Sequence, residues 1–452
     1  MNKSGTRDRT KPSGQRQSGR RLGKNTGKSS SDSAGSRRIE QVSEVLKQVL
    51  TWQQPADVLL SKYFRANPAM GARDRAQVAE AVFDVLRHLR RYRHHAQTGS
   101  GSMEVKLAAG GLFATLDESS RQTALTPDQL AWASHSEQID PASLPFGLRF
   151  SVPDWIEAGL KQLPDPESYA ASLLQGAPVD LRVNLLKGDR HSVLEQIQAQ
   201  LQGSRFAAEA TPYSPEGVRL TGHPPINRWQ LFADGVIEVQ DEGSQLLAHL
   251  VAPKRGEMVI DFCAGAGGKT LALGAMMRST GRLYAFDVSA ARLARAKPRF
   301  ARSGLSNIHP VVIRHERDDR VARLTGKAHR VLVDAPCTGL GTLRRNPDLK
   351  WRQDPEQLAR LCLEQASILI QAAKCVRPGG RLVYATCSFL REENEAQIEQ
   401  FLEKHPEFTL INATECLPVC PTNAVDESGM LRLRPDWHGT DGFFAAVLQK
   451  QA

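Results

Sequence analysis

The sequence predicts an α/β protein whose main domain is a doubly wound, mainly parallel sheet, preceded by a small α+β module and a short helical domain. From residue 254 onward, short apolar runs alternate with amphipathic helical segments, which is the pattern of successive βαβ units. A glycine-rich turn joins the first of these runs to a helix, as in many ligand-binding sheets of this kind. The chain of 452 residues is long enough for several domains, and 40% hydrophobic with 24% charged residues is typical of a globular protein.

Residues 1–38 form a basic tail that differs in composition from the rest of the chain. They contain eleven Lys or Arg and two Asp, so they hold +9 of the formal net charge of +10. Because the tail has few apolar residues to bury, we expect it to be disordered. It either binds nucleic-acid phosphates through salt-sensitive contacts or is a solvated extension that contributes little.

Residues 39–96 are predicted to form the helical domain, because apolar residues recur there at helical spacing in two stretches. The residues of these two apolar faces are Val42, Val45, Leu46, Val49, Val78, Val82, Val85, Leu86 and Leu89. Residues 97–150 lack such a pattern and begin with a Thr-Gly-Ser-Gly-Ser run. We therefore expect a linker there, with some helix around Pro127 to His135.

Residues 151–253 are predicted to form the α+β module. The expected elements are strands at Leu181 to Leu185 and Val236 to Gln240, a helix at His191 to Leu201, and a turn at Tyr213 to Gly217. This mixture of short strands with one clear helix indicates a compact unit of its own.

Residues 254–452 carry the βαβ pattern. The predicted strands are Met258–Phe262, Leu283–Asp287, Val311–Ile313, Val331–Asp334, Leu382–Thr386 and Phe443–Leu448. The predicted helices are Lys269–Arg278, Ala290–Arg302, Pro355–Val376 and Glu392–Lys404. Pro298 should kink the second helix, because proline removes one backbone hydrogen bond. Right-handed crossovers place the loops after the strands along one edge, where ligands of such sheets bind.

The loop after the first of these strands is the candidate cofactor site. It reads Cys263-Ala264-Gly265-Ala266-Gly267-Gly268-Lys269, and its glycines would let backbone amides approach a ligand. The second strand ends at Asp287, a carboxylate placed to accept both hydroxyls of a ribose. Two alternatives compete with this interpretation. A glycine-rich turn can serve only helix packing, and Gly268-Lys269-Thr270 imitates the end of a phosphate-binding P-loop, which needs glycine at the position of Cys263.

The seven cysteines do not form a disulfide framework, because their number is odd and all lie in the C-terminal half of the chain. Cys416 and Cys420 have no second ligand pair at metal spacing, so no metal site is predicted. The chain has no uninterrupted apolar segment of about 18 residues and no apolar N-terminal segment. We therefore expect a cytoplasmic protein that does not cross a membrane.

Two cysteines follow neighbouring predicted strands. The fourth strand leads into Asp334-Ala335-Pro336-Cys337 and the fifth ends in Thr386-Cys387-Ser388, so both thiols and Asp334 are expected at the ligand-binding edge. A thiolate is a soft nucleophile that can also leave again, and a carboxyl group beside it can act as an acid. The alternatives are that the cysteines fill the core and that Asp334 caps a turn.

The loop after Cys337 is a candidate nucleic-acid contact. It carries Arg344, Arg345, Lys350 and Trp351, which combine cations that pair with phosphates and an aromatic ring that can stack on a base. The alternative is a surface loop with its charges in solvent.

These motifs resemble those of the Nop/Sun family of RNA (cytosine-5) methyltransferases, and most closely those of its bacterial ribosomal small-subunit members. The matching residues are Cys263 to Thr270, Asp287, Asp334 to Cys337, Arg344 to Trp351, and Thr386 to Ser388. Upstream, Leu181 to Asn184 and Glu238 to Gln245 resemble the family's RNA-binding module. The resemblance implies a class I (Rossmann-like) methyltransferase domain over residues 254–452, with S-adenosylmethionine as cofactor and RNA, above all ribosomal RNA, as partner.

The resemblance also implies a role for each catalytic residue. Cys387 would attack the base, Cys337 would help to release the product, and Lys269 would lie near the reacting groups. Carbon 5 of cytosine is a poor nucleophile until a thiolate adds at carbon 6 and an acid, here Asp334, assists at nitrogen 3. The loop from Cys263 to Lys269, Asp287 and Asp334 would line the cofactor pocket. A transfer RNA substrate, or an RNA-binding ribosome-assembly factor with secondary catalytic activity, remains the alternative.

Two positions depart from the family's pattern. Ala266 stands where the family usually has proline, which should loosen the loop but keep its amides. His315-Glu316 stands where the third strand usually ends in Gly-Asp, so the contact to the adenine is left open. Residues 39–96 resemble a NusB-like domain in shortened form, and we expect a monomer.

Overall fold

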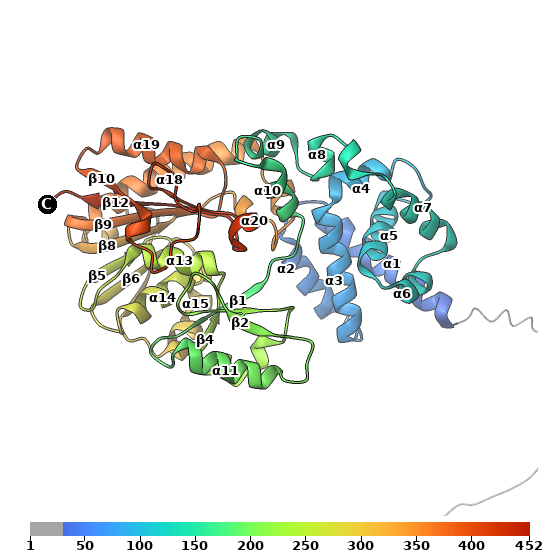
Figure 1. The fold of residues 1–452 in the computed structure, drawn as a ribbon, viewed down its shortest axis with the longest axis horizontal. Helices are drawn as coiled ribbons and strands as arrows, with labels where there is room; N and C mark the ends of the chain where they lie inside the picture. Colours follow the sequence, from blue (N-terminus) through green and yellow to red (C-terminus); the bar gives the residue numbers. More distant parts are fainter. Residues whose placement is uncertain (1–29) are drawn as a thin grey trace, which may run out of the picture.

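The computed structural model describes residues 30–452, with side chains from residue 37 onward. Figure 1 shows three regions in chain order: a cluster of helices, a small sheet with helix α11, and a larger sheet with helices on both faces. Residues 1–29, most of the predicted basic tail, lie outside the described part. Within that part, no helix combines the length and apolar character that a membrane span requires.

The first region is helical. Its helices are α1 (Ser30–Val49), α2 (Ala56–Ala66), α3 (Ala72–Arg87), α4 (Leu89–His95), α5 (Met103–Thr115), α6 (Glu118–Ala124) and α7 (Pro127–Glu137). The predicted apolar faces are confirmed, because Val42, Val45, Val78 and Val82 are buried in one core. Since α1 begins at Ser30, residues 30–38 are helical and do not continue the tail.

The prediction of a linker over residues 97–150 is wrong in its secondary structure. Helix α5 lies there and packs against α1 and α3, with Leu107, Ala108 and Leu112 buried in their common core. Because α5 is apolar on nearly all sides, it lacks the periodic alternation by which an amphipathic helix is recognised. The helix expected around Pro127 to His135 is confirmed as α7.

A helical connection joins the first region to the rest of the chain (Figure 1). It consists of α8 (Phe146–Arg149), α9 (Asp154–Leu160) and α10 (Pro166–Leu173). Ile156 and Tyr169 of this connection pack in one cluster with Leu343 and Phe389, which belong to loops of the large sheet. This helical connection is therefore packed against the loops that follow the two candidate catalytic cysteines, Cys337 and Cys387.

The α+β module is an antiparallel sheet with the order β2-β3-β1-β4. Its elements are β1 (Val179–Val183), α11 (Arg190–Leu201), β2 (Ala208–Ala210), β3 (Gly217–Leu220), α12 (Gln230–Ala233) and β4 (Ile237–Val239). Leu181 and Val183 share an apolar core with Ile197 of α11. Asp180 alternates with them along β1 and lies on the other face, where it binds Arg219 of β3. This charged face meets the helices of the large sheet. Strands β2 and β3 were absent from the prediction.

The large sheet has the strand order β10-β12-β9-β8-β5-β6-β7, and β11 pairs with β12. The strands are β5 (Met258–Asp261), β6 (Arg282–Asp287), β7 (Ile308–Val312), β8 (Ala328–Asp334), β9 (Val376–Thr386), β10 (Phe408–Ile411), β11 (Leu431–Leu433) and β12 (Phe443–Lys450). Strands β5 to β9 are parallel to their neighbours, and β12 runs antiparallel to β9. All six predicted strands are present, and β10 and β11 add to them.

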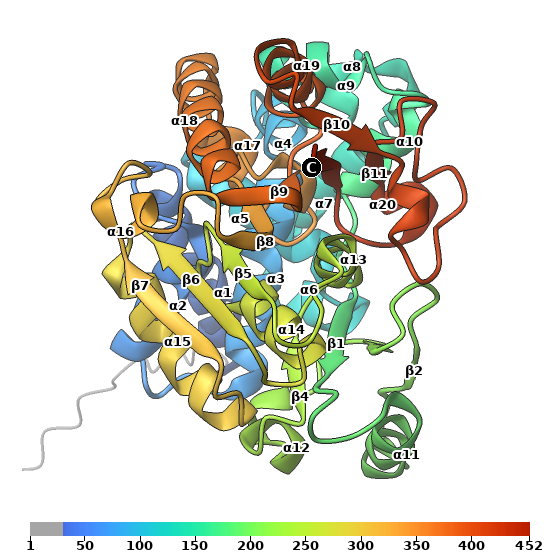
Figure 2. The ribbon, with the colours of Figure 1, turned by 90° about the vertical axis from the view of Figure 1, so that its left-hand side faces the viewer.

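Helices cover both faces of this sheet (Figures 1 and 2). The helices of this region are α13 (Glu242–Val251), α14 (Gly268–Met276), α15 (Ala290–Ser303), α16 (Asp319–Ala322), α17 (Leu349–Arg352), α18 (Pro355–Cys375), α19 (Glu395–Lys404) and α20 (Pro435–His438). Of these, α17 packs against α3 and α20 against α10. Leu369 of α18 and Ile398 of α19 belong to one core cluster, and Leu246 of α13 and Leu273 of α14 to another. The doubly wound, Rossmann-like architecture is thus confirmed, with the carboxyl ends of β5, β6, β8 and β9 at one edge.

Candidate active site

A cavity of about 620 Å³ lies at this edge of the large sheet. Its walls include Cys263, Ala264, Gly265, Ala266, Gly268, Lys269, Asp287, Asp334, Cys337 and Cys387. Parallel neighbouring strands end at the same edge, so the loops that follow them meet there. The structure therefore brings together every predicted cofactor and catalytic residue except Gly267, which lies behind the wall.

Two glycines shape the loop between β5 and α14. Gly265 (φ +56°) and Gly267 (φ +82°) have left-handed backbone conformations that residues with a Cβ disfavour. A Cβ on Gly267 would also lie 2.4 Å from the ring of Phe300, so glycine is needed for the packing of the loop against α15. The carbonyl of Ala266 accepts a 2.6 Å hydrogen bond from Arg299 of the same helix. The loop is thus tied to α15 at two points.

Asp287 ends β6 directly beside this loop and is almost fully buried. Its Oδ2 accepts the N–H of Gly265 at 2.8 Å, and its Oδ1 accepts the N–H of Ser289 at 2.7 Å. Arg292 lies 3.4 Å from Oδ1. A carboxylate oxygen can accept more than one hydrogen bond, so Asp287 is held in place with capacity left for the hydroxyls of a ribose.

Lys269 and Thr270 are already engaged within the protein, which argues against a P-loop. Lys269 Nζ donates to Asp334 Oδ2 at 2.8 Å, and Thr270 Oγ1 donates to Asp261 Oδ2 at 2.6 Å. A P-loop needs this cation and this hydroxyl for phosphates and magnesium. Burial raises the pKa of Asp261 to about 7. Asp261 was not among the predicted site residues, although its place at the end of the first strand was a signal in the sequence.

The two candidate thiols lie side by side, because Cys337 follows β8 and Cys387 follows the parallel neighbour β9. Their Sγ atoms are 3.3 Å apart, and both cysteines are free. A hydrogen bond with Cys387, together with burial, raises the pKa of Cys337. Burial lowers the pKa of Lys269, but its interactions with Asp334 and Cys387 raise this pKa by more. The net pKa is above the ordinary value, so Lys269 remains a cation. Both cysteines line the cavity, and Cys387 also packs against the core of the sheet.

The far end of the cavity is largely apolar, with Val288, Ile313 and Ile368 in its walls. Glu316 stands at its margin and accepts a 2.6 Å hydrogen bond from Ser367, which lowers the pKa of the Glu316 carboxyl. His315 is not part of this wall. Of the two residues at the departure from the family's pattern, Glu316 is therefore the one that can meet a ligand.

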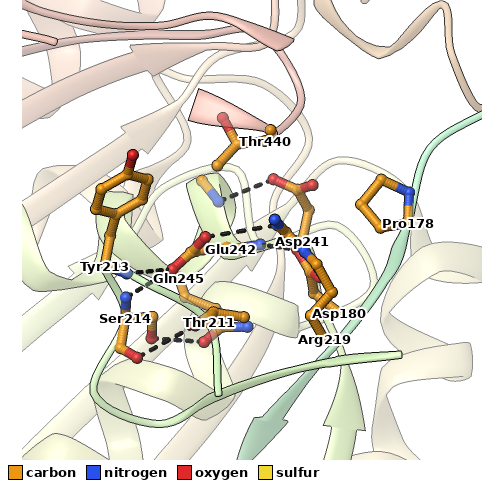
Figure 3. Close-up of polar contacts among 12 residues, drawn as sticks. Pro178, Asp180, Thr211, Tyr213, Ser214, Arg219, Asp241, Glu242, Gln245 and Thr440 are labelled. Atoms are coloured by element: carbon orange, nitrogen blue, oxygen red, sulfur yellow. Dashed lines mark hydrogen bonds and ion pairs between the residues drawn. The ribbon is translucent and has the colours of Figure 1, made fainter. Parts of the chain in front are cut away.

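The α+β module supplies another wall of the cavity, which includes Asp180 and Asp241, two residues absent from the predicted site. Figure 3 shows how closely these groups are bonded. Arg219 donates to both oxygens of Asp180, at 2.8 and 2.9 Å, and the N–H of Glu242 donates to Asp180 at 3.0 Å. The module is thus joined to the start of α13 by buried charges.

Arg345 completes this junction by lying between two buried carboxylates. It donates to Asp241 at 2.8 Å, to Asp441 at 2.6 Å and to the carbonyl of Pro178 at 2.9 Å. Burial and then the nearby Asp441 raise the pKa of Asp241 to about 7. Asp241 and Asp441 are far apart in the sequence, so their common contact with Arg345 could not be predicted. The signal in the sequence for this junction was the pair of acids Asp241-Glu242 after β4.

The four side chains selected as RNA contacts in the loop after Cys337 all bond within the chain. These side chains are Arg344, Arg345, Lys350 and Trp351. Lys350 Nζ donates to the carbonyl of Arg87 at 2.7 Å, and Trp351 Nε1 donates to the carbonyl of Leu86 at 2.9 Å. Burial lowers the pKa of Lys350 to about 7. Arg344 is buried and donates to the carbonyl of Gly439. The loop therefore closes the end of α3, a partner that local sequence does not reveal.

The doubly wound sheet, the glycine-rich loop after β5 and a carboxylate placed to accept ribose hydroxyls, Asp287, are together the features of a class I methyltransferase. Comparisons with known proteins agree. Residues 248–449 match the family described as 16S rRNA methyltransferase RsmB/F, and residues 152–227 match the RsmF/B-like ferredoxin-like domain. The probable ribosomal RNA small subunit methyltransferase B of Synechocystis sp. is 37% identical over 316 residues, which cover 69% of this chain and 70% of that protein. Its counterpart in Bacillus subtilis is 35% identical over 274 residues, 60% of this chain and 59% of that protein.

Solved structures show the same fold. The crystal structure of PH0851 has a TM-score of 0.73 at 26% identity and covers 93% of this chain and 99% of its own. A methyltransferase homolog protein from Pyrococcus horikoshii has a TM-score of 0.59 at 29% identity, over 69% of this chain and all of its own. The chain belongs to the RsmB/F family of 16S rRNA methyltransferases.

Proposed function

We propose that this protein transfers a methyl group from S-adenosylmethionine to carbon 5 of a cytosine in small-subunit ribosomal RNA, through a covalent bond between Cys387 and the base. The main support is the pair of thiols 3.3 Å apart beside the Lys269–Asp334 ion pair. The same cavity contains the glycine loop and Asp287. One site thus offers a nucleophile, an acid and a place for a nucleoside.

The residues present fit S-adenosylmethionine. Asp287 would accept its ribose hydroxyls, and the amides of the glycine loop would surround its polar parts. The apolar end of the cavity, with Ile313 and Ile368, would take the adenine, and Glu316 would accept from its amino group. When bound, this cofactor supplies an electrophilic methyl group on a positively charged sulfur.

The protein's own groups would activate the base. The Cys387 thiolate adds to carbon 6 of the cytosine, and the electrons of the 5,6 double bond move toward carbon 5 and nitrogen 3. As charge builds on nitrogen 3, the Lys269 ammonium would pass a proton to the Asp334 carboxylate with which it is paired, and Asp334 would hydrogen-bond or protonate nitrogen 3. Carbon 5 can then take the methyl group as the bond between that group and the donor sulfur breaks.

Release reverses the addition. A base removes the proton from carbon 5, the electrons of that C–H bond re-form the 5,6 double bond, and the bond between carbon 6 and the Cys387 sulfur breaks. Cys337 lies next to the leaving sulfur, so it is the group we assign to assisting this step.

Ribosomal RNA is proposed as substrate because the matching family and relatives carry that substrate in their names. The basic tail and the module of residues 151–253 are proposed to hold the RNA backbone. Nothing in the described contacts favours a transfer RNA substrate, and an assembly factor with secondary activity would have no need of the paired thiols and the Lys269–Asp334 pair.

Bisulfite sequencing of total RNA from cells with and without this gene tests the proposal, since 5-methylcytosine resists conversion. We expect one cytosine of small-subunit ribosomal RNA to lose its protection when the gene is deleted. Loss at a transfer RNA site would move the substrate, and no lost site would contradict the proposed reaction on cellular RNA.

A further inference from the structure

Two buried residues, Glu393 and Asn394, lie behind the catalytic thiols and take no part in the reaction described above. They connect η4 (Arg391–Glu393) to α19, and they are 0% and 2% exposed. The sequence predicts a helix that starts at Glu392 and includes both. In the structure α19 starts only at Glu395, so both side chains can bond to other parts of the chain.

Asn394 holds the residues on either side of Cys387. Its Oδ1 accepts the hydroxyl of Thr386 at 2.5 Å, and its Nδ2 donates to the carbonyl of Ser388 at 3.0 Å. One buried amide thus spans the Thr-Cys-Ser segment and leaves the Cys387 side chain little freedom to move relative to β9.

Glu393 fixes the chain next to Cys337 in a similar way. Its carboxylate accepts the N–H of Thr338 at 2.8 Å and the hydroxyl of Thr338 at 2.5 Å. Gln365 donates to Glu393 at 2.9 Å and to the carbonyl of Pro336 at 2.8 Å. The residues before and after Cys337 are therefore both fixed, as they are for Cys387.

The two thiol segments are also joined to each other. The hydroxyls of Thr338 and Ser388 are 3.2 Å apart, and the N–H of Gly341 donates to the carbonyl of Cys387 at 2.8 Å. Two consecutive residues of one turn thus set the position of both sulfur atoms through their nearest chain neighbours.

The charges on the two sides of the thiol pair are unlike. In the described part of the chain, the hydrogen bonds to the Glu393 carboxylate come from neutral donors, so its negative charge is not cancelled by a cation. A fixed negative charge disfavours a thiolate beside it. After the hydrogen bond with Cys387 and burial, Glu393 is among the groups that raise the pKa of Cys337. The cation Lys269 acts on Cys387 from the cavity side.

We propose that Glu393 and Asn394 are positioning residues that hold the two sulfur atoms in register, and that the Glu393 carboxylate keeps the proton of the pair on Cys337. Cys387 is then the thiol that ionises. The catalytic meaning of this division depends on the proposed function, but the behaviour of the two thiols does not.

Other charged or titratable groups that bear on the thiols must be considered in any pH experiment. They are Lys269 of α14, Asp334 of β8, Asp261 of β5, Cys263 of the glycine loop, Tyr384 of β9, and Arg292, Glu364, Arg345, Asp241 and Asp441 around the cavity. All of them are unchanged in the variant used below, so the difference between two proteins isolates Glu393.

The test is alkylation of the full-length protein by iodoacetamide, with each cysteine followed by peptide mass spectrometry between about pH 6 and pH 10. In the wild type, Cys387 should be alkylated before Cys337. In Glu393→Gln, which keeps the shape of the side chain but removes its charge, the pH midpoint for Cys337 should fall by about one unit or more. Glu399→Gln, which removes an exposed carboxylate of α19, serves as the control and should match the wild type.

An unchanged Cys337 midpoint in folded Glu393→Gln would overturn the charge assignment. Preferential alkylation of Cys337 in the wild type would also overturn it, even if the variant failed to fold. The positioning claim is tested by Asn394→Ala, for which we expect kcat to fall by about tenfold with KM for RNA unchanged. A raised KM with unchanged kcat would overturn that claim. If the wild type transferred no methyl group, the proposed function would fail, while the alkylation result would still decide the thiol assignment.

Discussion

The two walls of the cavity are both built from buried and partly buried polar groups, but their charges are compensated differently. In the module wall, Arg219 pairs with Asp180, and Arg345 bridges two carboxylates. In the thiol wall, formed by the ends of β8 and β9 and the start of α14, Lys269 pairs with Asp334, and a hydrogen bond joins Cys337 and Cys387.

The module wall of this cavity mainly stabilises the structure, and the thiol wall mainly provides groups for the reaction. Groups that satisfy one another hold a geometry, whereas groups with unused hydrogen-bonding capacity can act on a ligand. Substitutions in the module wall should therefore reduce stability, and substitutions in the thiol wall should reduce turnover in a protein that remains folded.

The largest effect is expected for Cys387→Ala, which removes the proposed nucleophile. Methyl transfer from labelled cofactor to RNA should fall by at least about a thousandfold, because the group proposed to add to carbon 6 is removed. The thermal unfolding temperature should change little, since the cysteine faces the cavity. Cys420→Ala, outside the cavity wall, is the matched control. Full activity of Cys387→Ala would remove the covalent step.

Asp334→Asn should come next, with kcat reduced by about a hundredfold. Asparagine keeps the shape of the side chain but cannot pair with Lys269 as a carboxylate or supply a proton to nitrogen 3. Steady-state kinetics on the RNA substrate measures the effect. An increase in KM with unchanged kcat would mean that Asp334 only binds substrate.

In the module wall, Asp241→Asn should change how stability depends on pH. Because the pKa of Asp241 is raised from 3.8 to about 7, the folded state binds more protons than the unfolded state between these values. This contribution to stability is fully present below about pH 4 and is lost as the pH rises through about 7.

Urea unfolding should therefore show a steeper loss of stability between about pH 4 and pH 7 in the wild type than in Asp241→Asn, by on the order of 1 kcal/mol. Asp234→Asn, an exposed aspartate of the same module, should keep the wild-type slope. Parallel curves for wild type and Asp241→Asn would show that the junction does not hold Asp241 in a proton-binding state.

The smallest effect is expected for Trp351→Phe. It removes the hydrogen bond from Nε1 to the carbonyl of Leu86 while keeping most of the ring packing, so the free energy of unfolding should fall by about 1 kcal/mol. RNA affinity, measured by filter binding at several salt concentrations, should stay the same. Weaker RNA binding with unchanged stability would instead support the predicted RNA contact of Trp351.

The sequence was most informative where topology alone decides position. Asp287, Asp334, Cys337 and Cys387 follow parallel strands, and parallel strands end at a common edge, so their meeting could be predicted without knowing any side-chain contact. The glycine loop was predictable for the same reason, because it directly follows β5 and precedes α14.

Prediction failed where a partner comes from a distant segment. Lys350 and Trp351 bond to backbone carbonyls at the end of α3, and no local pattern reveals this. Asp180 and Asp241 belong to the site because the module packs on the large sheet, and this packing could not be predicted from the sequence. Helix α5 escaped prediction because a helix buried on several sides has no amphipathic period.

The covalent role of Cys387 is tested most directly by incubating Cys337→Ala with small-subunit ribosomal RNA and S-adenosylmethionine, followed by nuclease digestion and peptide mass spectrometry. Without Cys337 to assist release, a methylated cytosine should accumulate on the enzyme, bonded to the peptide that contains Cys387. A variant that turns over at the wild-type rate with no adduct, or an adduct on another residue, would contradict the account.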